Sequence, residues 1–130
     1  MSGHTNLSAV LKSIKVFCDN VEYGFATTKQ PIEFGDQILG TFQEEEGLTI
    51  IASKQYLEDK GLKYEGSYAK LTIEAHTSLE LVGLTAVLAK RLADHKISAN
   101  VVAGFFHDHI FVQYDVRQSA IDAINSLKED

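Results

Sequence analysis

In the stretch AKLTIEAHTSLELVGLTAVLAKRLADH, residues 69–95, the spacing between apolar residues changes once, and this change decides the fold. From Ala69 to His76 every second residue is apolar, which is typical of a strand with one buried face. From Leu79 to His95 apolar residues recur every three or four positions, and Thr77-Ser78-Leu79-Glu80 in front of them has the form of a capping box. The stretch therefore predicts a strand followed by an amphipathic helix.

Two strands and a second helix are expected after this pair. Ser98 to Phe106 and His109 to Tyr114 favour strands joined by a tight turn, and Asp115 to Leu127 favours a helix with Asp115 as its N-cap. A strand-helix-strand crossover is right-handed and leaves a gap that the third strand fills in antiparallel orientation. We therefore expect a ferredoxin-like sheet in which His76, Thr77 and Ser78 approach the turn at residues 106–109.

The first half of the chain predicts the order strand, loop, strand, strand, helix. A short helix is expected before it at Asn6 to Ile14, and Pro31 and Gly35 break the segment that follows residues 22–28. The remaining expected elements are strands at residues 15–17, 22–28, 38–44 and 48–53, followed by a brief helix at residues 54–60.

Composition excludes several classes of protein. The 130 residues are 45% apolar, enough for a real core, yet no apolar run is long enough to span a membrane. The net charge of −6, without a cluster of Lys and Arg, argues against binding to nucleic acid or to an anionic membrane surface. Cys18 is the only cysteine, which fits a reducing, cytoplasmic location and excludes a site of several thiolates within one chain.

The segment from His76 to Val112 resembles the second half of small bacterial proteins built from two tandem ACT-like domains. The resemblance rests on Ser78-Leu79-Glu80, on Val82-Gly83-Leu84-Thr85 and on the run from Ile97 to Gly104 that leads into His107-Asp108-His109. Thr41-Phe42 and the run from Glu45 to Thr49 extend it to the first half, so that it covers nearly the whole chain.

The resemblance implies an α+β fold of two tandem ferredoxin-like ACT units with their sheets joined side by side. We place these units at residues 1–64 and 65–130, and a loop around Pro31 to Asp36 replaces the first helix of the first unit. ACT modules are regulatory and often bind amino acids at interfaces between modules. The resemblance thus implies a non-catalytic sensor of a small amino acid or related metabolite, without a cofactor and open to pairing as a homodimer. It implies no known ligand.

The residues that we expect at a ligand site gather around the predicted helix start and the hairpin. A helix start favours an anion such as a carboxylate, and Gly83, placed one turn into the predicted helix, indicates a close approach. An Asn in an otherwise apolar strand needs hydrogen-bond partners, which a ligand could supply at Asn100. The candidate ligand-binding residues are Thr77, Ser78, Leu79, Gly83, Asn100, Val101, Gly104, His107 and Asp108.

The polar group His107-Asp108-His109 has three interpretations. With His76 it could bind a metal, although it lacks the spacing of the compact metal motifs. A catalytic His-Asp pair would need a nucleophile, and none is recognisable beside it. The interpretation that we favour is a hairpin turn in which Asp108 bonds its own backbone. The alternative to a sensor is a structural or regulatory subunit that binds a protein partner or itself, and a metal protein is the third class.

Overall fold

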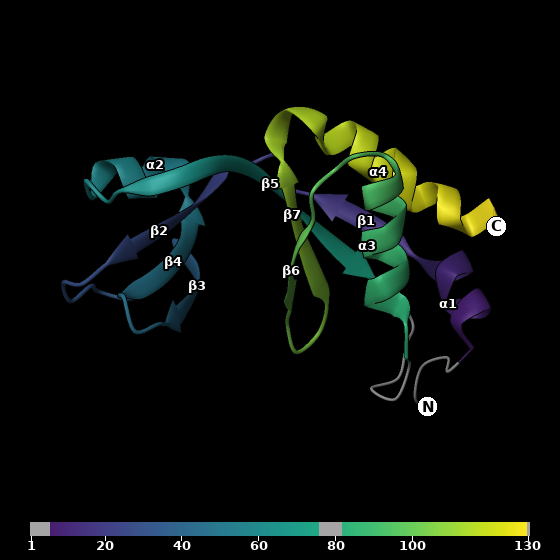
Figure 1. Cartoon of the computed structure of the whole chain (residues 1–130), viewed down its shortest axis with the longest axis horizontal. Helices are drawn as coiled ribbons and strands as arrows, with labels where there is room; N and C mark the ends of the chain where they lie inside the picture. The colour runs from purple at the N-terminus through teal and green to yellow at the C-terminus, as the bar shows by residue number, and fades with distance from the viewer. Residues whose placement is uncertain (1–5, 76–81, 130) are drawn as a thin grey trace. The chain divides into compact units, whose positions relative to one another are not determined.

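The computed structural model describes residues 6–75 and 82–129, which divide into two compact units (Figure 1). Unit 1 comprises residues 1–19 and 69–130, and unit 2 comprises residues 20–68. The elements in chain order are α1 (Leu7–Ser13), β1 (Lys15–Cys18), β2 (Tyr23–Thr28), β3 (Ile38–Gln43), β4 (Leu48–Ser53), α2 (Lys54–Asp59), β5 (Tyr64–Glu74), α3 (Leu84–Asp94), β6 (Asn100–Ala103), β7 (Asp108–Gln113), η1 (Tyr114–Val116), α4 (Arg117–Asn125) and η2 (Ser126–Glu129).

Unit 1 has the predicted split strand-helix-strand arrangement. Strand β7 lies between β5 and β6, which α3 connects, and β1 pairs antiparallel with β5. The order β1-β5-β7-β6 therefore carries the gap-filling third strand that the sequence predicted. The fourth strand, β1, comes from the N-terminal part of the chain and not from the C-terminal half.

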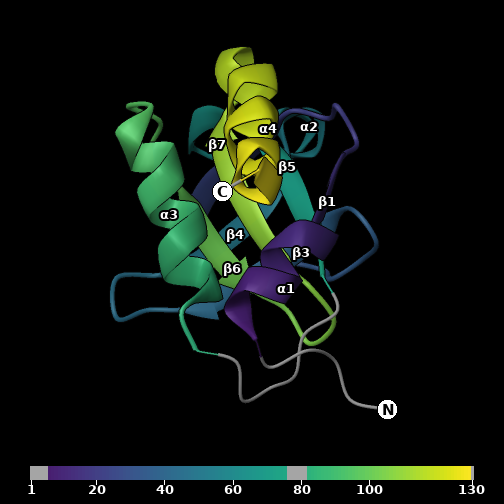
Figure 2. The same ribbon diagram turned by 90° about the vertical axis from the view of Figure 1, so that its right-hand side faces the viewer.

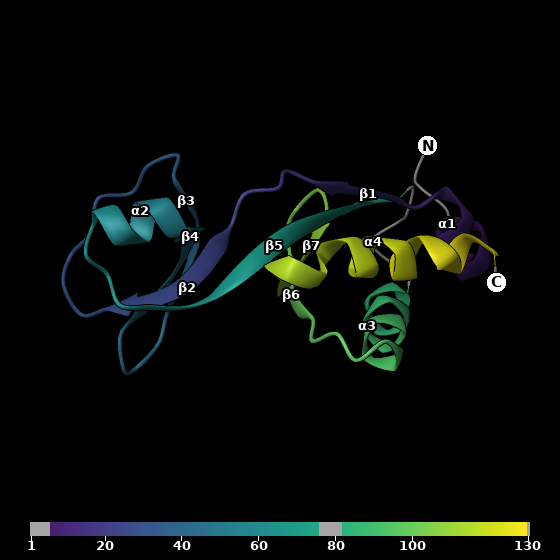
Figure 3. The same cartoon turned by 90° about the horizontal axis from the view of Figure 1, so that it is seen from above.

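Helices cover one face of the unit 1 strands. Figure 3 shows α3 and α4 on the same side of β1 and β5, and Figure 2 shows the two helices next to each other. Helix α1 contacts η2 at the far end of α4 (Figure 3). The core between helices and strands consists of Val10, Ile14, Ala69, Leu71, Ile73, Leu84, Leu88, Leu92, Ile97, Ile110, Val112, Ala120, Ala123, Ile124 and Leu127.

Unit 2 has the same strand arrangement with a single helix. Strand β2 lies between β4 and the first part of β5, and α2 packs against β2 and β4. Its core is small and consists of Ala26, Ile50, Ala52 and Leu57. Residues 29–37, between β2 and β3, contain no helix, so the predicted replacement of the first helix by a loop is confirmed.

Two predicted helix starts are wrong. The helix expected from Leu79 begins at Leu84, and Gly83 is its N-cap at φ +101° and not a residue of its first turn. A left-handed backbone cannot continue a helix, and glycine adopts it without strain. The last helix begins at Arg117 with Val116 as N-cap, because Asp115 lies within the 3₁₀ turn η1.

The predicted boundary between the two ACT units, at residues 64 and 65, stays a prediction. The compact units divide the chain differently, because residues 1–19 belong with residues 69–130. Within the described residues, no helix has the length and apolar character that crossing a membrane requires.

Candidate functional site

Helix α3 begins beside the β6–β7 hairpin. Thr85 lies in the first turn of α3, and its hydroxyl donates a long hydrogen bond of 3.5 Å to Oδ2 of Asp108. Gly83 offers no side chain to cap the helix, and the first N–H groups of any helix lack partners within it. Among the described residues, a Cβ added to Gly83 would meet only Leu7, at 3.7 Å, and the backbone angle of φ +101° accounts for the glycine.

The hairpin turn lies two residues earlier in the chain than predicted, at residues 104–107. Asp108 is the first residue of β7 and pairs with Ala103, so it does not adopt the turn conformation that we expected. The N–H of Gly104 donates to the carbonyl oxygen of His107 at 2.9 Å and closes a turn with Phe105 and Phe106 at its tip. A Cβ at Gly104 would lie 2.9 Å from that same oxygen, which explains why glycine stands there.

The two faces of the sheet separate Asp108 from His109. Successive residues of a strand point to opposite faces, and Ile110 and Val112 after Asp108 lie in the helix-covered core. Asp108 accordingly reaches Thr85 on the helix side, whereas Nδ1 of His109 lies 3.1 Å from Oγ1 of Thr72 on the other face. The His-Asp-His sequence therefore does not converge on one point as a metal site or a catalytic pair requires.

The environment of His109 shifts its pKa. Partial burial of the imidazole lowers its pKa below 6.5, and Lys70 and His107 lower it further, while Asp108 opposes them.

Phe17 lies opposite Thr72 on β1, and Val102 lies opposite His109 on β6. The side chains of Phe17 and Val102 are 63% and 39% exposed. The sheet face that carries them, on the side of Thr72 and His109, therefore remains largely open within the described part of unit 1.

The other predicted ligand-binding residues are distributed unevenly. Asn100 pairs with Phe111 and lies at the opposite end of the β6–β7 pair from Asp108. Val101 packs against the core of unit 1. Thr77, Ser78 and Leu79, like His76, fall in residues 76–81, outside the described part of the chain. The structure thus brings Gly83, Gly104, His107 and Asp108 to one edge, and their role in binding stays a prediction.

Metal ligands are not clustered in the described parts of the chain. Among residues 6–75 and 82–129, no three His, Cys, Asp or Glu side chains are placed to hold one ion.

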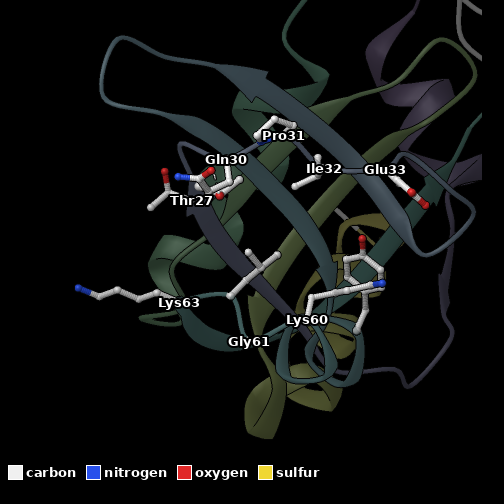
Figure 4. A pocket seen from close by; sticks show the side chains of 11 residues that line it. Thr27, Gln30, Pro31, Ile32, Glu33, Lys60, Gly61 and Lys63 are labelled. Atoms are coloured by element: carbon white, nitrogen blue, oxygen red, sulfur yellow. Dashed lines mark hydrogen bonds between the residues drawn. The ribbon is translucent and has the colours of Figure 1, made fainter.

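A hollow in unit 2 was not anticipated from the sequence. It has a volume of about 610 Å³ and lies between the loop after β2 and the end of α2 (Figure 4). Thr27, Ile32, Glu33, Tyr56 and Lys60 are among its lining residues. The signal that could have indicated it was the missing helix around Pro31, because a loop covers less of a sheet than a helix does.

Comparisons with known proteins agree with this fold. The sequence profile of the ACT domain matches residues 2–69, and a second ACT domain profile matches residues 63–126. A Vibrio cholerae protein of unknown function is 35% identical, with a TM-score of 0.86 over 94% of this chain and 95% of that chain. No significant match is found among curated proteins.

More distant structures share the fold alone. A protein from Agrobacterium tumefaciens has 17% identity and a TM-score of 0.73, and the match covers 88% of this chain and 89% of that one. The ligand-free regulatory subunit of aspartate kinase from Thermus thermophilus has 11% identity and a TM-score of 0.59, over 88% of this chain and 98% of that one.

The depressed pKa of His109 predicts a pH dependence of stability. The unfolded imidazole binds a proton near pH 6.5, whereas the folded one does so only at lower pH. The unfolded chain therefore binds more protons in this window, and the free energy of unfolding falls as the pH decreases from 6.5 toward the folded pKa. Urea denaturation at a series of pH values should show a shallower dependence in His109→Gln than in the natural protein. His95→Gln, a change at an exposed end of α3, is the control, and equal slopes in the natural protein and His109→Gln would contradict the assignment.

Proposed function

Because the chain belongs to the ACT domain family, we propose that it is a non-catalytic regulatory protein that senses a small amino acid or a related metabolite. Support comes from both halves of the chain, since each matches an ACT domain. The structural similarity to the regulatory subunit of aspartate kinase supports the assigned fold.

The observation that carries the proposal is the start of α3 beside Asp108. The first turn of a helix offers N–H groups and the positive end of the helix dipole, both of which favour a carboxylate. Asp108 lies next to that turn through Thr85, and its carboxylate can accept a hydrogen bond from an ammonium group. A zwitterion would therefore meet a partner for each of its charges at this edge, where Gly83 adds no side chain.

A thermal-shift screen of the natural protein against the twenty amino acids and common metabolites tests the proposal. A ligand at 100 times its dissociation constant adds about 2.7 kcal/mol to the free energy of unfolding, so the melting temperature should rise. Asp108→Asn should weaken binding of the active compound about tenfold, because one charged hydrogen bond is lost. Asp122→Asn, on the exposed side of α4, is the matched control and should bind normally.

Either of two results would refute this form of the sensor. In one, no compound raises the melting temperature. In the other, a compound does so equally in Asp108→Asn and in the natural protein, which would place its site elsewhere.

The tip of the β6–β7 hairpin favours a second function, a structural or regulatory subunit that binds a protein partner or itself. Phe105 and Phe106 are 91% and 83% exposed, and their rings contact each other edge to face with centroids 4.9 Å apart. Two adjacent exposed aromatic rings are more typical of an interface than of a free surface.

Sedimentation velocity at increasing concentration tests self-association through this tip. We expect the natural protein to form a dimer and a variant with Phe105→Ser and Phe106→Ser to remain a monomer, because the variant lacks the apolar contact. Phe34→Ser, a change at another exposed phenylalanine, is the control. A natural protein that stays monomeric at every concentration would contradict self-association.

A further inference from the structure

We propose that the hollow of unit 2 binds a small carboxylate that has an apolar body. The hollow lies entirely within residues 27–63, so this proposal does not depend on the start of α3 in unit 1. The loop at residues 29–37 and the end of α2 form its walls (Figure 4).

The hollow exists because unit 2 lacks one helix. In a ferredoxin-like unit, a helix between the first two strands covers part of the sheet. Here residues 29–37 take its place, and Ile32 is the one residue of this loop that is partly buried. Because Ile32 packs against the small core of unit 2, it fixes the loop above the sheet while space remains beside it.

The floor of the hollow is apolar. Ile32 and Leu62 line it, and the ring of Tyr56 forms part of the same lining. All three side chains are partly exposed and pack against the core of unit 2, so their remaining surface faces the space. An apolar group of a ligand would remove that surface from water, which is favourable at about 25 cal/mol per Å².

Lys60 supplies the positive charge for the carboxylate. Its Nζ lies 5.8 Å from the centre of the Tyr56 ring, which positions the ammonium over the lining of the hollow. Lys63 also lines the hollow, but Figure 4 shows its amine pointing away from the other labelled side chains. We therefore assign the anion to Lys60.

The distribution of charge favours an anion in this hollow over the neighbouring one. Two lysines and one acidic residue, Glu33, line the first hollow. The second, of about 460 Å³, shares Glu33 and Lys60 but adds Asp36 and Asp59. A carboxylate would be repelled there, because three acidic side chains face one lysine.

Titration of the full-length protein with isocaproate, followed by amide NMR, tests the proposal. The amides of Ile32 and Leu62 should shift, and the neutral analogue isocaproamide should bind about tenfold more weakly because it lacks the charge. Lys60→Gln should weaken isocaproate binding about tenfold as well. Lys63→Gln is the matched control and should bind as the natural protein does, and so should Asp108→Asn, which separates this site from that of unit 1.

Four outcomes would overturn the proposal. They are an absence of shifts with isocaproate, equal binding of isocaproate and isocaproamide, unchanged binding in Lys60→Gln, and binding of leucine without binding of isocaproate. The last would mean that the hollow requires an ammonium group and is not a site for simple carboxylates.

Discussion

The antiparallel pairing of β1 with β5 is the interaction on which the rest of unit 1 depends. It joins Lys15 to Glu74 and Cys18 to Leu71, and it gives the C-terminal part of the chain a fourth strand that it does not itself contain. Val16 and Cys18 thereby face the core, and α1, immediately before β1, is brought against η2. Because β5 also neighbours β7, the same strand fixes the position of the hairpin that carries Asp108 and His109.

The sheet that this pairing completes also explains why the polar side chains at the start of β7 do not converge on one point. Alternation along a strand sends Asp108 toward α3 and His109 toward Thr72, so that two side chains adjacent in sequence serve different surfaces. On the helix side a carboxylate lies beside the first turn of α3, and on the other side a partly buried imidazole holds a lowered pKa. The first of these arrangements suits recognition of a charged small molecule.

The sequence predicted most of the strands, the split crossover and the loop around Pro31 to Asp36, because apolar period and Pro-Gly breaks are local signals. It missed the first part of β5, which begins at Tyr64 and not at Ala69. The start of α3 was wrong because the apolar spacing runs through Gly83, whose left-handed angle no period reveals. The turn was misplaced because Asp108 is a typical turn residue, whereas the close contact of Gly104 with the His107 carbonyl sets the actual turn. Membership of residues 1–19 in unit 1 and the hollow beside Ile32 depend on long-range packing, which no local pattern encodes.

Native-state hydrogen exchange tests the central claim, that β1 completes unit 1. Amides of β1 that point toward β5 should exchange with the same free energy of opening as the core amides of Ile110 and Val112, because one cooperative unit opens as a whole. The β4 amides of Ile50 and Ala52 should follow the opening of unit 2. Exchange of β1 in step with β4, or without protection at all, would contradict the account.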